Sequence, residues 1–411
     1  MRRTKTMWLA SMVFVGLLAP GVVRADVDPE AELKAITAHV QAEIKDAQDK
    51  KLDPDMTALR KEYADKAKEA GKGVDPSKVD PAKGMAWAQL FGAAQEPKKM
   101  IAAAERFLTS NPAPQPKFNA QMTILRGYSQ AEDANGIIKT VKEIQPSTPM
   151  MAMQLAATTT NYLDTVAEKK GSKSALALLK QVEALVPFEQ LKTPQELNAG
   201  DSIRLEISGA RADLLDKDGK RAEALAALEE GKKHLSPKSR YAPAFAAKTT
   251  FISLPGTPAP VLKRERGYGE FTSLDAYKGK VVVLDFMAHW CGPCKAAFPD
   301  MKKMYDDLHS KGLEVVSITN YYGFFDNERG LKPDAEFAKM EGFVAKYNLT
   351  WPVVFGDKSN AENYGVSGIP HFVIIDQTGK VNSISVGYTP ELHAKLRKTV
   401  ESLLNRKVAL K

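Results

Sequence analysis

The sequence predicts two folded parts, an all-α region followed by an α/β domain. In the first part, alanine, lysine, glutamate and leucine dominate, and apolar residues recur at helical spacing. In the last third of the chain, apolar runs of strand length alternate with amphipathic segments. A proline-rich stretch separates the helical region from the α/β region. A chain of 411 residues has room for two or three such domains.

Composition and charge exclude several classes of protein. Hydrophobic residues make up 44% and charged residues 26% of the chain, as in ordinary globular proteins, which excludes wholesale disorder. The net charge is +8, but four basic and no acidic side chains lie in the first 25 residues, so the remainder is only mildly basic. We therefore expect no nucleic acid among the partners. Two cysteines cannot staple a chain of this size, which excludes a disulfide-held scaffold.

Residues 1–25 have the three parts of a secretory signal peptide. Basic residues precede an apolar run over residues 7–19, and Ala25 marks the expected cleavage site. The run is short for a bilayer span, which takes about 20 residues. We expect a protein exported to the periplasm or cell envelope, or one with an N-terminal membrane anchor if the signal is not cleaved.

Residues 26–237 are predicted to form a helical domain. Four amphipathic helices, each followed by a proline, are expected over residues 101–108, 137–144, 175–185 and 222–235. The steps between these prolines are 34, 41 and 50 residues, so the region resembles a degenerate tetratricopeptide array, and an irregular helical domain is the alternative. Its histidines and acids form no tight cluster, so we expect a surface for a partner or for self-association rather than a catalytic site.

Residues 238–262 are predicted to form a linker because they hold several prolines and little periodicity. Beyond it, strands are expected over residues 281–286, 313–319, 353–355, 371–375 and 381–386. Helices are expected from about 291 to 309, over 334–347 and over 391–404. The first strand is apolar throughout, as a central parallel strand requires.

Both cysteines lie at one place, where the first strand leads into a helix. Cys291 and Cys294 are three residues apart and can close and reopen a small disulfide ring. A helix that starts at Cys291 directs backbone N–H groups at its sulfur, which lowers the thiol pKa and makes this cysteine the exposed nucleophile. Cys294, one turn further, would resolve a mixed disulfide. The alternatives are a zinc site, for which only His289 is near, and a structural disulfide. We expect no metal and no cofactor besides the cysteine pair.

Further motifs surround the pair. Trp290 and a Gly-Pro spacer complete a Trp-Cys-Gly-Pro-Cys motif, Asp285 lies six residues before Cys291, and a Gly-Ile-Pro segment ends at Pro370. With these motifs, residues 253–405 resemble thioredoxin, and more closely the exported TlpA/ResA-like thiol–disulfide oxidoreductases. The resemblance implies a thioredoxin-like α/β fold for this domain.

The resemblance also implies roles for single residues. Asp285 would be the buried acid that moves the proton of Cys294, and Pro370 would be a cis-proline that faces the disulfide. The residues implied to contact the substrate are Trp290, Gly292, Pro293 and Ile369. Each has a plainer alternative, namely an acid bonded to the backbone for Asp285, a trans turn for Pro370 and core packing for Trp290.

The departures from the family pattern include two histidines. For His289 and His371 we favour an uncharged ring that packs or lies at the surface over a role in tuning the thiolate. The lysine that partners the buried acid in thioredoxin has no counterpart that we can place in this sequence. An aromatic cluster over residues 321–325 is interpreted as core or lid packing, with a docking surface beside the disulfide as the alternative.

The predicted function is that of an exported thiol–disulfide oxidoreductase acting on protein thiols and disulfides. The Gly-Pro spacer resembles reducing thioredoxins, at about −270 mV, and favours a reductant that a membrane electron donor re-reduces. One alternative is a scaffold or binding protein whose redox domain is accessory. A peroxiredoxin-type peroxidase is a weaker alternative, because Ala288 stands where that family needs a threonine.

Overall fold

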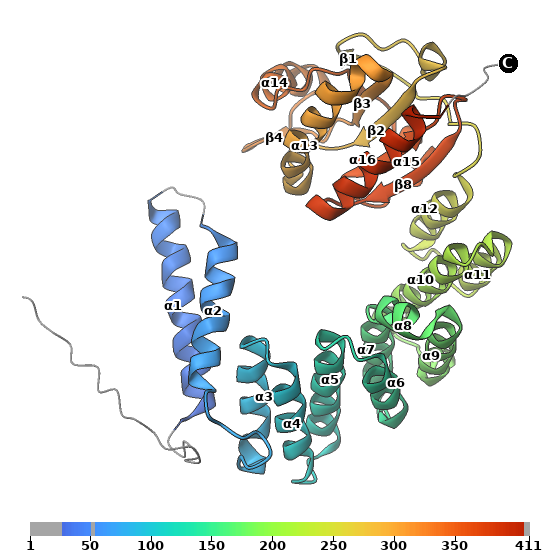
Figure 1. Ribbon diagram of the computed structural model, residues 1–411. Coiled ribbons are helices and arrows are strands. Elements are labelled where there is room, and N and C mark those ends of the chain that lie inside the picture. The colour runs from blue at the N-terminus through green and yellow to red at the C-terminus, as the bar shows by residue number, and fades with distance from the viewer. Residues whose placement is uncertain (1–26, 51–53, 407–411) are drawn as a thin grey trace, which may run out of the picture. The chain divides into compact units, whose positions relative to one another are not determined.

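The computed structural model describes residues 27–50 and 54–406 (Figure 1). The predicted signal peptide, residues 1–25, lies outside these residues. Within the described ranges, no helix combines the length and apolar character needed to span a bilayer. The chain divides into two compact units, Met1–Leu185 and Val186–Lys411, and each is described by itself.

The first unit is built from helices, most of which pack on the next helix in the chain, whereas the sixth also packs on the eighth and the seventh packs on the ninth (Figure 1). They are α1 (Pro29–Asp49), α2 (Met56–Ala70), α3 (Gly84–Ala93), α4 (Pro97–Leu108), α5 (Pro114–Gln130), α6 (Ala134–Glu143), α7 (Pro149–Thr160), α8 (Leu163–Lys170) and α9 (Ser172–Leu185). Proline begins several of them, because the first turn of a helix does not need the N–H that proline lacks. The helices predicted around residues 101–108, 137–144 and 175–185 are confirmed, whereas the repeat interpretation stays a prediction.

Small residues set the spacing of these helices. Gly136 lies against the ring of Tyr128, and a Cβ atom there would overlap it, so α5 and α6 approach more closely than two larger residues would allow. Leu90, Phe91 and Met100 are fully buried between α2, α3 and α4. Burial of apolar side chains therefore holds consecutive helices together.

Three more helices open the second unit: α10 (Pro194–Lys217), α11 (Arg221–Lys233) and α12 (Ala242–Ser253). Helix α11 confirms the helix predicted over residues 222–235. Helix α12 differs from the expectation, because it lies inside the stretch 238–262 that composition marks as a linker. Pro243 falls in its first turn, where proline favours a helix start. The domain boundaries themselves stay predictions.

The α/β part contains a six-stranded mixed sheet in the order β1-β6-β3-β2-β7-β8. The strands are β1 (Arg266–Tyr268), β2 (Val281–Phe286), β3 (Leu313–Thr319), β6 (Val353–Phe355), β7 (His371–Ile375) and β8 (Val381–Val386). All five predicted strands are confirmed. The central strand β2 is parallel to β3 but antiparallel to β7, so it is a parallel strand on one side only. The sequence patterns missed β1, the short hairpin of β4 (Phe324–Phe325) and β5 (Glu328–Arg329), and helix α15 (Lys358–Asn363), which are too short to show a period.

Both faces of the sheet are buried. On one face, Val281 and Val283 belong to a core with side chains of α13 (Gly292–Leu308), α14 (Pro333–Lys346) and α16 (Pro390–Leu404). On the other, Val282 and Leu284 pack with Tyr364 and the segment that leads into the sheet. Because strand residues alternate between faces, β2 is apolar at almost every position. Helices α13 and α16 lie together over the first face (Figure 1).

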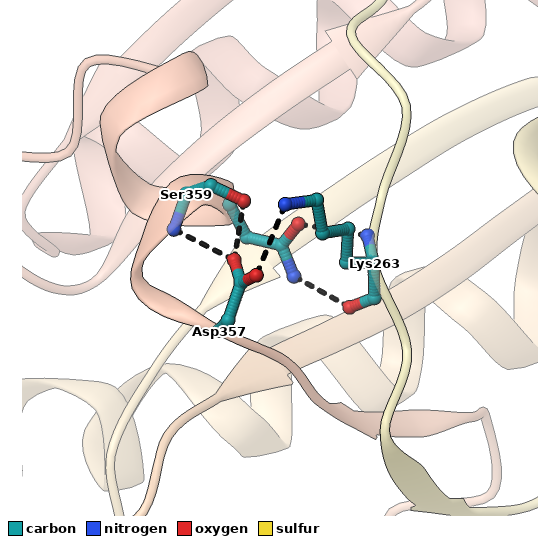
Figure 2. Close-up of polar contacts among 4 residues, drawn as sticks. Lys263, Asp357 and Ser359 are labelled. Atoms are coloured by element: carbon teal, nitrogen blue, oxygen red, sulfur yellow. Dashed lines mark hydrogen bonds and ion pairs between the residues drawn. The ribbon is translucent and has the colours of Figure 1, made fainter.

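A small polar network anchors the segment that leads into the sheet (Figure 2). The backbone N–H of Lys263 donates to Asn360 Oδ1 at 2.8 Å, and Asn360 Nδ2 donates to Lys263 O at 2.8 Å. Asp357 accepts from Ser359 N at 2.8 Å and pairs with Lys263 Nζ at 3.1 Å. At Gly356 a Cβ atom would collide with the Asn360 amide, so glycine makes room for this network.

We expect Asn360→Ala to lower the free energy of unfolding by about 2 kcal/mol, because both backbone groups of Lys263 lose their buried partner. The matched control is Lys263→Ala, which removes only the exposed ion pair to Asp357 and should cost less than about 1 kcal/mol. Urea unfolding of the two variants measures both values. Equal losses would show that the amide pairing does not anchor the segment.

Candidate active site

The cysteine pair lies where β2 leads into α13. Cys291 is the N-cap residue of α13, and its Sγ accepts a hydrogen bond from Cys294 N at 3.1 Å. The two sulfurs form a disulfide. The exposed nucleophile expected at Cys291 is not exposed in this state, since its exposed fraction is 4% against 1% for Cys294. Both cysteines belong to the apolar core that also holds Met287.

The residues around Cys291 are accessible. Gly292 and Pro293 are exposed, and Trp290 is 48% exposed with its ring edge-on to Tyr322 at 5.4 Å. The bulky indole therefore lies beside the disulfide rather than in the core. The exposed residues that flank Cys291 in the sequence therefore carry no charge.

Asp285 lies on β2 two residues from Val283 and Met287, which belong to the core cluster that contains both cysteines. It is 1% exposed, and its Oδ2 accepts from Ser317 Oγ at 3.0 Å. The alternative of an acid bonded to the backbone is therefore wrong. Burial raises the pKa of the Asp285 carboxyl from 3.8 to about 7, and the hydrogen bond from Ser317 opposes that shift.

Two residues near Asp285 escaped the sequence analysis. Ser317 Oγ donates to Asp285 Oδ2, and Trp351 Nε1 donates to Ser317 Oγ at 2.9 Å. A hydroxyl and an indole inside apolar runs look like packing residues. The only available signal was the strand spacing, which places Ser317 on the same face as Leu313 and Val315.

The loop before β7 carries the predicted cis-proline. The bond between Ile369 and Pro370 is cis, which confirms that prediction. Pro370 is buried and its carbonyl accepts from Gly387 N at 2.8 Å. Ile369 is partly buried and packs against the core clusters on the two faces of the sheet. The roles of these residues toward a substrate stay predictions.

Both histidines are buried rings. His371 packs edge-on against Phe286 and Phe251, on the sheet face opposite the cysteines, and burial lowers its pKa to about 4. His289 is 3% exposed and stacks on Phe325 at 4.6 Å, and burial lowers its pKa too. Both are therefore uncharged at neutral pH, in agreement with the packing interpretation.

The inserted stretch between β3 and β6 lies against the active-site loop. Tyr322 and Phe324 surround His289 with Phe325, which agrees with packing rather than a free docking surface. Glu336, on α14, is 1% exposed and accepts from Tyr322 N at 2.8 Å and from Gly323 N at 2.8 Å. A buried carboxylate therefore fixes the turn that supports Trp290 through Tyr322.

In the part of the chain that the structure describes, no group of three histidine, cysteine or acidic side chains is arranged to hold a metal ion.

A disulfide at the start of a helix, a buried acid on the preceding strand and a cis-proline loop, all on a mixed sheet, define a thioredoxin-like thiol–disulfide oxidoreductase. Comparison with known proteins narrows this class. The AhpC/TSA family profile matches residues 255–384. The thioredoxin-like protein YneN of Bacillus subtilis is 33% identical over 132 residues, which are 32% of this chain and 71% of that protein.

The thiol-disulfide oxidoreductase ResA of Bacillus subtilis is 30% identical over 152 residues, 37% of this chain and 76% of that protein. The chain therefore belongs to the ResA/YneN family of thiol–disulfide oxidoreductases. Among solved structures, a putative thiol:disulfide interchange protein DsbE from Chlorobium tepidum is 30% identical, with a TM-score of 0.30, and the match covers 37% of this chain and 98% of that one.

Proposed function

We propose that the protein is an exported reductant that transfers electrons from Cys291 and Cys294 to disulfides of other proteins. The observation that carries this proposal is the cysteine pair at the start of α13, with Cys294 N–H on Cys291 Sγ and the buried Asp285 on the strand before it. A backbone N–H directed at a sulfur favours its thiolate form, and the helix dipole acts in the same direction.

The reaction starts from the dithiol. The Cys291 thiolate attacks one sulfur of the substrate disulfide, and the other substrate sulfur leaves as a thiolate. Cys294 then loses its proton to Asp285 and attacks Cys291 Sγ, which releases the second substrate thiolate and forms the Cys291–Cys294 disulfide. The substrate gains two electrons, and the protein is left in the oxidised form seen in the structure.

Residues that flank Cys291 and the residue before the cis-proline form the proposed substrate-binding surface. Trp290, Gly292, Pro293 and Ile369 would bind an extended segment of the substrate, with Pro370 facing the disulfide. Export rests on the signal-like residues 1–25, and an exported reductant needs a membrane electron donor to restore its dithiol.

A covalent trap with insulin as the disulfide substrate tests the proposal. Cys294→Ser leaves the nucleophile without its resolving thiol, so we expect an insulin adduct that dithiothreitol releases. Cys291→Ser should form none, because Cys294 lies within the first turn of α13 rather than at its N-cap, where a backbone N–H favours the thiolate of Cys291. Equal adducts from both variants would contradict the assigned roles.

The direction of electron flow has its own test. We expect a reduction potential near the −270 mV of thioredoxin, measured by equilibration with dithiothreitol buffers. A value above about −150 mV would identify an oxidant and contradict the proposed direction.

A further inference from the structure

Three buried side chains form a hydrogen-bonded row behind the disulfide. They come from three adjacent strands or their ends, namely Asp285 on β2, Ser317 on β3 and Trp351 just before β6. Trp351 Nε1 lies 2.9 Å from Ser317 Oγ, which lies 3.0 Å from Asp285 Oδ2. The exposed fractions are 2% for Trp351, 0% for Ser317 and 1% for Asp285, so water does not compete for these hydrogen bonds.

The chemistry of the three groups fixes the direction of the row. An indole N–H can only donate, so Ser317 Oγ accepts from Trp351 with a lone pair. The single proton of the Ser317 hydroxyl is then left for Asp285 Oδ2. The other carboxyl oxygen, Asp285 Oδ1, is buried and has no hydrogen-bond partner. The two oxygens of one carboxyl are therefore in different situations.

We propose that Ser317 and Trp351 are positioning residues for the proton step, and that they make Asp285 Oδ1 the atom that receives the proton of Cys294. This inference rests on the proposed function. One proton moves from the Cys294 thiol to Oδ1, the Cys294 sulfur bonds to Cys291 Sγ, and the substrate sulfur leaves as a thiolate. Ser317 keeps its proton on Oγ, donated to Asp285 Oδ2, throughout the step and is not a carrier.

Among the side chains around Asp285, Ser317 is the one whose hydrogen bond changes the pKa of the carboxyl. Across the sheet, Asp285 pairs with Ser317 on β3 and Phe372 on β7. The core cluster that contains its neighbours Val283 and Met287 also includes Cys291 and Cys294 at the start of α13, which do not titrate as a disulfide. Burial and the bond from Ser317 are the causes of its altered pKa, and no charged side chain contributes. Loss of the hydroxyl should therefore move the titration directly.

The titration of Asp285 in the oxidised full-length protein tests this inference. The infrared band of the protonated carboxyl, identified by its absence in Asp285→Asn, is followed from pH 5 to pH 9. We expect Ser317→Ala to raise the midpoint by about one pH unit, since it removes a hydrogen bond to the charged form. Trp351→Phe should raise it by less, because the hydroxyl remains but is no longer oriented.

Thr319→Val is the matched control, since it removes another buried hydroxyl from β3, two residues from Ser317. Its midpoint should equal that of the wild type. An unchanged midpoint in Ser317→Ala, or an equal shift in Thr319→Val, overturns the inference. If Ser317→Ala does not fold, Trp351→Phe decides in the same way, with an upward shift supporting the inference and an unchanged midpoint overturning it.

The pH profile of insulin reduction is a second readout that simple loss of packing would not move. In the wild type, the rate should rise with pH as Asp285 loses its proton and can accept that of Cys294. In Ser317→Ala the midpoint of this rise should move to higher pH, along with the infrared midpoint. Because the infrared titration needs no turnover, it is independent of the proposed function. A successful covalent trap with no shift in Ser317→Ala contradicts only the positioning role, whereas a shift without trapping contradicts only the proposed function.

Discussion

Asp285→Asn is expected to stabilise the folded protein above pH 7 by up to about 4 kcal/mol relative to the wild type. Burial raises the carboxyl pKa from 3.8 to about 7, so between these values the folded state holds a proton that the unfolded state has released. The wild type is therefore favoured by the protonated acid below about pH 4 and loses that contribution as the pH rises through 7. The amide does not titrate, so the stability advantage of the variant should grow across this window and reach its full size above pH 7.

Urea unfolding of the oxidised protein at pH 4, 6 and 8 measures this difference. Asp306→Asn, which removes an exposed carboxylate on α13, is the control and should change stability by less than about 1 kcal/mol at each pH. A constant difference between Asp285→Asn and the wild type would show that the carboxyl does not titrate in this range.

The same substitution should slow catalysis. Without an acceptor for the proton of Cys294, resolution of the mixed disulfide should fall about 100-fold, the lower range of general-base catalysis. Stopped-flow reduction of insulin separates this step from the first attack by Cys291, which should keep its rate. A variant that is both more stable and slower would show that the buried charge is retained for function.

Elements that carry one residue pattern along their whole length are the ones that could be predicted from the sequence. The apolar run of β2 and the Cys-Gly-Pro-Cys motif predict the strand, the helix start and the disulfide position, because backbone geometry repeats along each element. Ser317 and Trp351 could not be predicted as partners of Asp285, since their contacts join residues 32 and 34 positions apart in the sequence. Pairing of β2 with β3 creates the first contact, and the register decides it.

Helix α12 is a case in which residue composition predicted the wrong local structure. Its prolines and small residues have the composition of a linker, yet Phe245 and Ile252 are almost fully buried. Packing against α11 and the α/β part decides the structure here. The buried Glu336 is a further case, because only the folded insertion shows which backbone groups it binds.

Glu336→Ala is expected to lower the free energy of unfolding by about 3 kcal/mol. The backbone N–H groups of Tyr322 and Gly323 both donate to this carboxylate, and alanine would leave them without a partner. Because Tyr322 lies edge-on to Trp290, the freed turn should also disturb the surface beside Cys291. We therefore expect a several-fold rise in KM for insulin, with a smaller change in kcat.

Asp334→Ala is the matched control for Glu336→Ala, since Asp334 lies in the same first turn of α14 but is 80% exposed, and its ion pair to Arg266 is at the surface. Its loss should cost less than about 1 kcal/mol and leave KM unchanged. Glu336→Gln keeps one acceptor oxygen and should fall between the two. Urea unfolding and steady-state reduction of insulin measure both effects. A KM that stays at the wild-type value in Glu336→Ala, despite lost stability, would show that the turn stabilises the fold without shaping the substrate surface.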